Sequence, residues 1–224
     1  VTPDQKLRKA MYDPLTEQKA VSGTVSLIGS DFTLDENSDV RRLLRTAGYT
    51  LKELPGCRTW EEYQQLGTGE LLISCYPPAK YGADILAERL KRQHLYLPGS
   101  FDYREIKEEI QRLIHALRIE KNVSSNDLEA FFDSEITLCE DAFRHAKTVI
   151  GDTPIVLDYL FHPRPLGLAK ILLEHGFQVT AVYLDSISPE EKSAFDWIKI
   201  YHPDLELRAT IQVKMRVLPR NSET

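Results

Sequence analysis

The sequence predicts an α/β protein with two domains, each built on a doubly wound parallel sheet. Short apolar stretches rich in β-branched residues alternate with amphipathic helical stretches four times within roughly the first hundred residues. After a long helical stretch the same alternation restarts near residue 154, but only about three further strands fit. The second domain is therefore expected to be small or truncated, because a parallel sheet needs more strands and covered faces.

Composition narrows the class of protein. The chain has 224 residues, of which 42% are hydrophobic and 28% charged, as in an ordinary soluble globular protein. A formal net charge of −6 disfavours a nucleic-acid partner, which would need clustered Lys and Arg. No apolar run reaches the roughly 18–20 residues that cross a bilayer, and no signal peptide opens the chain, so no membrane partner is expected.

The cysteines and the first residue indicate the setting. Three cysteines at widely spaced positions fit neither a disulfide framework nor a metal knuckle, so a reducing, cytoplasmic location is expected. The chain begins with Val1 rather than Met, which suggests a piece of a longer protein.

The first predicted domain spans residues 23–120 and follows a polar segment, 1–22, that we interpret as a linker. Thr59 and Glu62 form a capping-box pattern at the start of one of its helices, and Gly48 provides the stop of another. Its strands are predicted at 24–30, 49–54, 70–76 and 94–99, and its helices at 37–48, 59–66, 81–93 and 102–119.

A connecting helix is predicted within 121–150, and a partial second α/β domain over 151–224. Ser188 and Pro189 mark the start of one helix in this domain. The strands are predicted at 154–161, 177–184 and 205–210, and the helices at 164–176 and 188–202. Both domains are thus expected to be Rossmann-like, with right-handed crossovers and with ligands bound at the carboxyl edge of the sheet.

Most sequence motifs that would assign a chemistry are missing. The sequence contains no GxGxxG, no Walker A motif, no GxSxG, no HExxH and no zinc-spaced Cys or His pairs. The acidic residues Asp31, Asp35 and Glu36 follow the first strand and could hold a metal, or favour the start of the next helix through its dipole.

Three polar residues in and after the predicted strand at 154–161 are candidates for contacts with a ligand. His162 follows the carboxyl end of the strand, where it would be either a ligand contact or an exposed loop histidine. Arg164 would be either an anion contact or a solvated charge at a helix start. Asp158 lies inside an apolar strand and would need a partner if buried; its role is open.

Cys75 ends the predicted strand 70–76, directly before two prolines, in "LLISCYPPAKY". On composition alone a cysteine there is either a small core residue or a ligand at the functional edge of the sheet. Cys57 lies at another strand-to-helix turn and could share that edge, whereas Cys139 lies within a helix.

The stretch around Cys75 resembles the nitrogenase component 1 superfamily. That superfamily comprises nitrogenase molybdenum–iron subunits, the related cofactor-assembly scaffolds and the light-independent protochlorophyllide reductases. In its α-type chains a strand ends in a Cys-Tyr pair and a second Tyr opens the next helix, as Cys75, Tyr76 and Tyr81 do here. The order and spacing of segments over most of residues 22–210 is also similar to the superfamily's middle domain followed by the start of its third domain.

The resemblance implies a role for each candidate. Cys75 matches the cysteine that binds iron of the metallocofactor, and a thiolate is the soft ligand that an iron–sulfur cluster takes. Tyr76 and Tyr81 would support the cofactor's ligand from behind or serve as packing residues. His162 and Arg164, which are candidates from their position after a strand, are the further residues expected to bind the cofactor. An iron–sulfur cluster or iron-containing metallocofactor is expected in the full-length protein, and none in this fragment alone.

The resemblance also implies partners and an activity. The family works as heterotetramers of paralogous subunits that receive electrons from an ATP-dependent iron–sulfur reductase. Pro77 and Pro78 stand where nitrogenase α chains carry a basic residue, which indicates a nitrogenase-like protein rather than a nitrogenase. The expected function is an oxidoreductase subunit, inactive as a fragment. The alternatives are a non-catalytic metallocluster-assembly scaffold and a plain α/β small-ligand-binding module.

Overall fold

The structure is a computed structural model that describes residues 1–119 and 125–209. The chain divides into two compact units, unit 1 with Val1–Gly99 and Ile106–Leu128 and unit 2 with Ser100–Glu105 and Glu129–Thr224. Each unit contains a parallel sheet with helical crossovers, so the predicted fold class is confirmed. The predicted domain borders near 120 and the end of the second domain, 210–224, lie outside the described residues.

Unit 1 is built on a four-stranded parallel sheet with the order β2-β1-β3-β4. All four strands that the sequence predicts are present, and their ends lie one to three residues from the predicted ones. The strands are β1 (Val21–Leu27), β2 (Thr50–Glu53), β3 (Gly69–Ser74) and β4 (Gln93–Tyr96). The order reverses between β1 and β3, which is the topological switch point of a doubly wound sheet.

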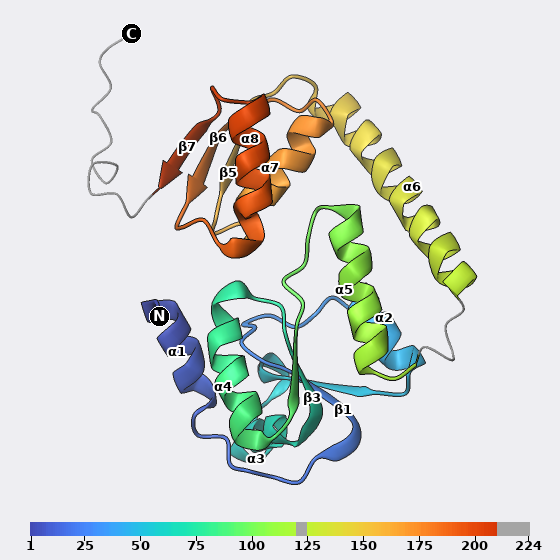
Figure 1. The fold of residues 1–224 in the computed structure, drawn as a ribbon, viewed down its shortest axis with the longest axis vertical. Helices are drawn as coiled ribbons and strands as arrows, with labels where there is room; N and C mark the ends of the chain where they lie inside the picture. The colour runs from blue at the N-terminus through green and yellow to red at the C-terminus, as the bar shows by residue number, and fades with distance from the viewer. Residues whose placement is uncertain (120–124, 210–224) are drawn as a thin grey trace. The chain divides into compact units, whose positions relative to one another are not determined.

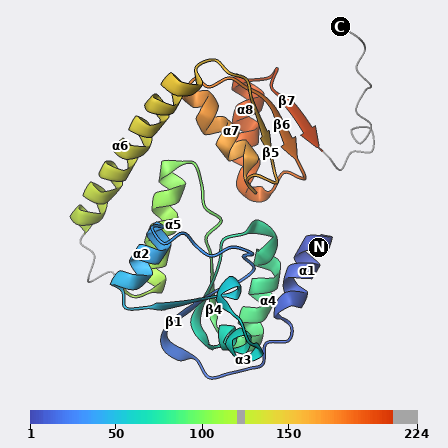
Figure 2. The same cartoon turned by 180° about the vertical axis from the view of Figure 1, so that it is seen from behind.

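Helices α2 (Asp39–Thr46) and α4 (Lys80–Leu90) cover opposite sides of this sheet, because the two right-handed crossovers run in opposite directions. Helix α5 (Tyr103–Ala116) lies beside α2 in Figures 1 and 2. The short helix α3 (Trp60–Gln64) starts with the predicted capping box, in which Thr59 accepts the Glu62 N–H and Glu62 accepts the Thr59 N–H.

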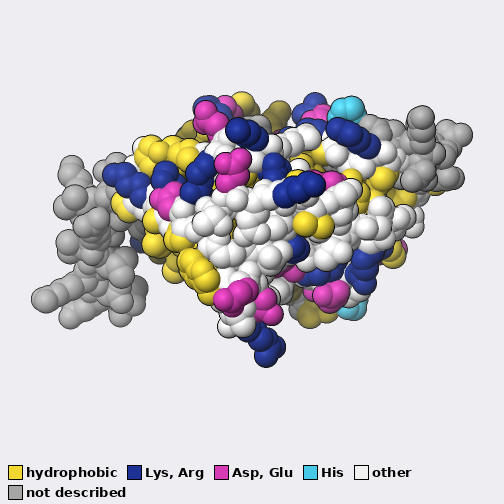
Figure 3. Space-filling view, turned by 90° about the horizontal axis from the view of Figure 1, so that it is seen from below, with side chains coloured by type: hydrophobic (Ala, Val, Ile, Leu, Met, Phe, Trp, Pro, Cys, Tyr) yellow, Lys and Arg dark blue, Asp and Glu magenta, His cyan; other side chains and the backbone are white. Residues whose placement is uncertain are grey.

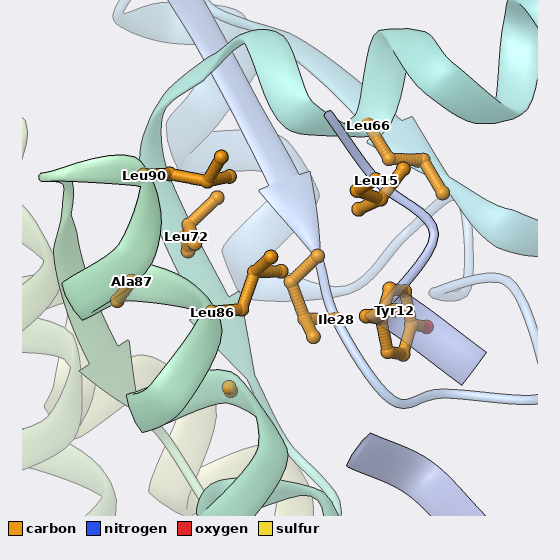
Figure 4. Packing of buried hydrophobic residues seen from close by; sticks show 9 residues of the cluster. Tyr12, Leu15, Ile28, Leu66, Leu72, Leu86, Ala87 and Leu90 are labelled. Atoms are coloured by element: carbon orange, nitrogen blue, oxygen red, sulfur yellow. The ribbon is translucent and has the colours of Figure 1, made fainter. Parts of the chain in front are cut away.

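Residues 3–12, which the sequence suggested as part of a linker, form helix α1 (Pro3–Tyr12). The helix packs closely against α4, where a Cβ at Gly82 would lie 2.8 Å from the Lys9 Cα. Tyr12 is 1% exposed and joins Leu15, Leu72 and Leu86 in a buried cluster (Figure 4). Polar composition hid this helix, because only its last turn carries a side chain that is deeply buried.

Unit 2 is built on a three-stranded parallel sheet with the order β5-β6-β7. Its strands are β5 (Ile155–Asp158), β6 (Val179–Leu184) and β7 (Glu206–Ala209). Its helices are α7 (Pro165–Glu174), α8 (Lys192–Tyr201) and the part of α6 (Ser125–Ile150) that follows Leu128. Successive crossovers in one direction place α7 and α8 on the same face, where Leu157, Val182 and Ile198 are buried together. Each predicted strand and helix of this unit is present within the described residues.

The surface carries charges of both signs. On the face shown in Figure 3, Lys and Arg side chains are interspersed with Asp and Glu rather than gathered into one field. Among the described residues, no helix is both long and apolar enough to cross a membrane.

Candidate functional site

The carboxyl edge of the unit 1 sheet brings several chain segments together. Gly29 follows β1, Glu53 ends β2, Cys75 follows β3 and Gly99 follows β4. Backbone N–H groups hold these segments in place: the Ile28 N–H donates to the Ile73 carbonyl at 2.7 Å, and the Gly99 N–H donates to the Glu109 carboxylate at 3.1 Å. In parallel sheets this edge is where ligands bind.

Cys75 lies at this edge as predicted, in the step from β3 to the 3-10 turn Pro77–Ala79. The residue retains some exposed surface, yet its thiol is strongly desolvated. Burial raises the pKa of the Cys75 thiol, and together with the nearby carboxylates of Glu109 and Glu53 it brings that pKa to about 12. The surroundings therefore keep this thiol protonated in the absence of a cation.

Tyr76 is engaged by helix α1. The Arg8 guanidinium lies over the Tyr76 ring, 4.9 Å from its centroid, and the Tyr76 hydroxyl donates to Asp4 at 3.3 Å. Burial and the Asp4 charge raise the pKa of Tyr76. Tyr81 is half-buried in the first turn of α4, so all three residues of the Cys-Tyr…Tyr pattern lie on one turn and the helix that follows it.

The acidic residues after β1 do not form a metal site. Asp31 accepts both Arg8 Nη groups at 2.6 Å, and Asp35 accepts the Asn37 N–H at 2.7 Å. Glu36 lies 3.5 Å from the Arg41 guanidinium. Within residues 1–119 and 125–209, no group of three or more His, Cys, Asp or Glu side chains could hold a metal ion.

Sequence reasoning missed one constellation beside Cys75. The Ser74 hydroxyl lies 2.8 Å from His94 Nε2, and His94 Nδ1 lies 2.7 Å from Asp84 Oδ1. Below, these three residues are called the Ser74–His94–Asp84 line. They come from β3, β4 and α4, and no short-range spacing signals that they meet.

In unit 2, the structure places Arg164 in the interior at the start of α7. Its side chain is 4% exposed and donates to the Glu190 carbonyl at 2.7 Å, with the Glu105 carboxylate at 3.4 Å. Arg164 thus ties α7 to the 3-10 turn Pro189–Glu191 before α8. Burial of the side chain excludes the alternative of a solvated charge, and the role of Arg164 in cofactor binding stays a prediction.

His162 is half-buried beside Arg164. Its Nδ1 accepts the Arg164 N–H at 3.0 Å, and its ring meets Phe101 edge-on with centroids 4.9 Å apart. Burial lowers the pKa of His162, and the Arg164 charge lowers it further. Asp158 accepts the Leu160 N–H at 2.6 Å and so closes the turn after β5.

The sequence also gave no sign that Glu191 would be buried, although only 1% of this residue is exposed. Its carboxylate accepts the Gly167 N–H at 2.8 Å at the start of α7, and burial raises its pKa to about 7. A Cβ at Gly167 would lie 3.2 Å from the Phe101 ring, so a glycine allows this close approach. The helix start that would suit an external anion is filled by a side chain of the chain itself.

A cavity of about 330 Å³ adjoins this cluster within unit 2. Several polar side chains of its lining are paired with one another: Tyr103 donates to Glu140 at 2.8 Å, and Lys170 lies 3.7 Å from Asp102 and 3.8 Å from Glu174. The predicted site residues thus fall into two groups, with Cys75, Tyr76 and Tyr81 in unit 1 and His162 and Arg164 in unit 2.

The chain is similar in fold to solved structures of nitrogenase Cp1. A structure of that protein at pH 6.5 superposes with a TM-score of 0.61 and 15% sequence identity, over 92% of this chain and 48% of that one. A structure at pH 5 gives a TM-score of 0.56 and 13% identity, over 84% of this chain and 38% of that one. This chain therefore spans less than half the length of either.

Sequence comparisons add nothing to this likeness. No known protein family matches the sequence. No curated protein matches it either. At such low identity the likeness to nitrogenase Cp1 is one of fold.

Proposed function

We propose that this chain is part of a nitrogenase-like oxidoreductase subunit in which Cys75 supplies one thiolate ligand to an iron-containing metallocofactor. The observation that carries the proposal is the position of Cys75. It lies at the carboxyl edge of a parallel sheet, next to the strand-order switch, in a chain that shares the fold of nitrogenase Cp1.

The residues present fit one ligand of such a group. A bound iron cluster would supply electron transfer, and its positive iron would deprotonate a coordinating thiol despite the raised pKa of Cys75. Cys75 is the one predicted metal ligand, so further ligands would come from outside the described part of the chain. Its carboxylate neighbours Glu53 and Glu109 would favour a net positive group over a free thiolate.

The neighbouring residues would shape the site rather than bind the metal. Pro77 and Pro78 form a rigid 3-10 turn with no side-chain charge, so this turn offers no cation to an anionic cofactor. Tyr76 is held by Asp4 and Arg8 and would form one wall. The proposal includes a paralogous subunit and an ATP-dependent iron–sulfur reductase as partners, in the cytoplasm.

Anaerobic expression of the full-length protein tests the ligand role. Iron content and the broad absorbance near roughly 400 nm, where thiolate–iron charge transfer absorbs, are measured for the wild type, Cys75→Ala and the control Cys139→Ala. Loss of iron only in Cys75→Ala supports the proposal. Iron content unchanged in Cys75→Ala would sink it.

Two alternatives would give other results. A metallocluster-assembly scaffold of the same fold would also lose iron in Cys75→Ala, but would pass its cluster to an acceptor protein and show no turnover with a reductase. A plain α/β ligand-binding module is favoured by the protonated state of the Cys75 thiol. That module would contain no iron in any variant.

A further inference from the structure

In the Ser74–His94–Asp84 line, donor and acceptor can be assigned for both hydrogen bonds. A carboxylate only accepts hydrogen bonds, so His94 Nδ1 carries the proton that Asp84 accepts. Burial lowers the pKa of His94, so the ring is neutral near pH 7 and its Nε2 accepts the Ser74 O–H. Lys80 also donates to Asp84 at 2.7 Å and balances the carboxylate charge.

The same order of groups occurs in serine hydrolases, but the burial here is different. Ser74 is 0% exposed, and the His94 side chain is 6% exposed. A nucleophile has to reach a substrate carbonyl, and the Ser74 hydroxyl cannot. The line therefore has no nucleophilic role in this fold.

What the line does connect is the two ends of one turn. Ser74 is the last residue of β3 and Asp84 lies in α4, whereas the turn 75–79 between them carries Cys75 and Tyr76. The Ser74 carbonyl is fixed as well, since it accepts the Leu97 N–H at 2.9 Å. Through His94, the line thus joins the end of β3 to the neighbouring strand β4 and to the following helix α4.

The line lies on the opposite face of the sheet from the Cys75 thiol. Ser74 shares the α4 face with Leu72, because side chains alternate along a strand. The thiol instead interacts with Glu109 of α5. Any influence of the line on Cys75 therefore passes through the backbone.

We infer that the Ser74–His94–Asp84 line is a positioning device that fixes the turn 75–79 and thereby the orientation of Cys75. This inference rests on the proposed ligand role of Cys75 for its functional meaning. Its structural claim is that the line keeps the turn closed and the Cys75 thiol shielded from solvent. This claim can be tested without any metal.

The first arm of the test measures access to the Cys75 thiol in the metal-free full-length protein. In a background where any other cysteines are serine, the rate of maleimide labelling is compared among variants at one pH. Ser74→Ala and His94→Phe should label about tenfold faster, the factor that one net hydrogen bond contributes to an opening equilibrium. His145→Phe, at an exposed position on α6, is the control and should label as the parent does.

A conservative pair separates positioning from general loss of structure. Asp84→Asn keeps an oxygen that accepts the His94 Nδ1–H, so it should label at nearly the parent rate. Asp84→Leu removes the acceptor and should resemble His94→Phe. Equal labelling rates in Ser74→Ala, His94→Phe and the parent would overturn the inference, and if His94→Phe does not fold, Ser74→Ala alone decides.

The second arm measures iron content and the absorbance near roughly 400 nm after anaerobic expression with native cysteines. Ser74→Ala and Asp84→Leu should shift or weaken the band, whereas Asp84→Asn should leave it as in the wild type. An unchanged absorbance band in every variant of the Ser74–His94–Asp84 line would contradict the inference that the line positions Cys75. Iron retained in Cys75→Ala would instead contradict the proposed function. In that case the maleimide-labelling rates would still test whether the Ser74–His94–Asp84 line fixes the turn.

Discussion

The Arg8 guanidinium and the Asp31 carboxylate form a two-pronged ion pair, with both N–O distances 2.6 Å. The pair joins α1 to the loop after β1, and Arg8 also lies 4.9 Å from the centre of the Tyr76 ring. Helix α1 is therefore fastened to the same sheet edge that carries Cys75.

Removal of Arg8 should loosen α1. The Arg8 side chain is 12% exposed but Asp31 is 50% exposed, so solvent screening limits the cost of Arg8→Ala to about 1–2 kcal/mol. Urea unfolding followed by Trp60 fluorescence in a Trp197→Phe background reports on unit 1. Lys9→Ala, which breaks an exposed pair with Asp13 at the C-terminal end of the same helix, should cost less than about 0.5 kcal/mol.

The same pair should respond to acid. The hydrogen bonds from Arg8 lower the pKa of Asp31 below its ordinary 3.8, so the stabilisation is present above that value and is lost as pH falls through the lowered one. The difference in unfolding free energy between wild type and Asp31→Asn should thus shrink below about pH 4. A difference that stayed constant down to pH 2 would contradict this origin.

Contact between α1 and α4 should depend on Gly82. A Cβ at Gly82 would meet the Lys9 backbone at 2.8–2.9 Å, which backbone shifts must relieve. Gly82→Ala should therefore destabilise unit 1 by about 1–3 kcal/mol in urea. Gly56→Ala, where a Cβ meets no atom within 4 Å, is the control.

Glu191 should make unit 2 less stable as pH rises. Burial raises its folded pKa to about 7 from 4.5, so the folded state holds a proton that the unfolded state releases. The stability is fully present below pH 4.5 and falls through pH 7, by on the order of 3 kcal/mol. Glu191→Gln should flatten this slope, as measured by Trp197 fluorescence in a Trp60→Phe background, whereas exposed Glu88→Gln should keep it.

Cys75 should be the slowest of the three cysteines to alkylate in the metal-free protein. With a pKa of about 12, the reactive thiolate is a minute fraction at pH 8. Mass spectrometry after timed iodoacetamide exposure should find exposed Cys139 modified at least about tenfold faster. Faster modification of Cys75 would show a preformed thiolate instead.

The sequence by itself determined the succession of strands and helices along the chain, except for helix α1, and the position of Cys75 at a strand end. Periodicity of 2 or 3.6, capping boxes and turn residues are local signals, and each spans only a few positions. The Thr59–Glu62 capping box is one such signal that the structure confirms, because both partners lie three residues apart.

Only the tertiary structure decided which side chains meet. Arg8 and Asp31 are 23 residues apart, and His94 is 20 residues from Ser74, so their contacts depend on sheet order and register rather than on spacing. The sequence left Arg164 open between an anion contact and a solvated charge, and only the fold shows that this side chain is buried against the turn before α8. The edge of a folded sheet brings together residues from separate crossovers, and no short stretch of sequence shows which of them will meet.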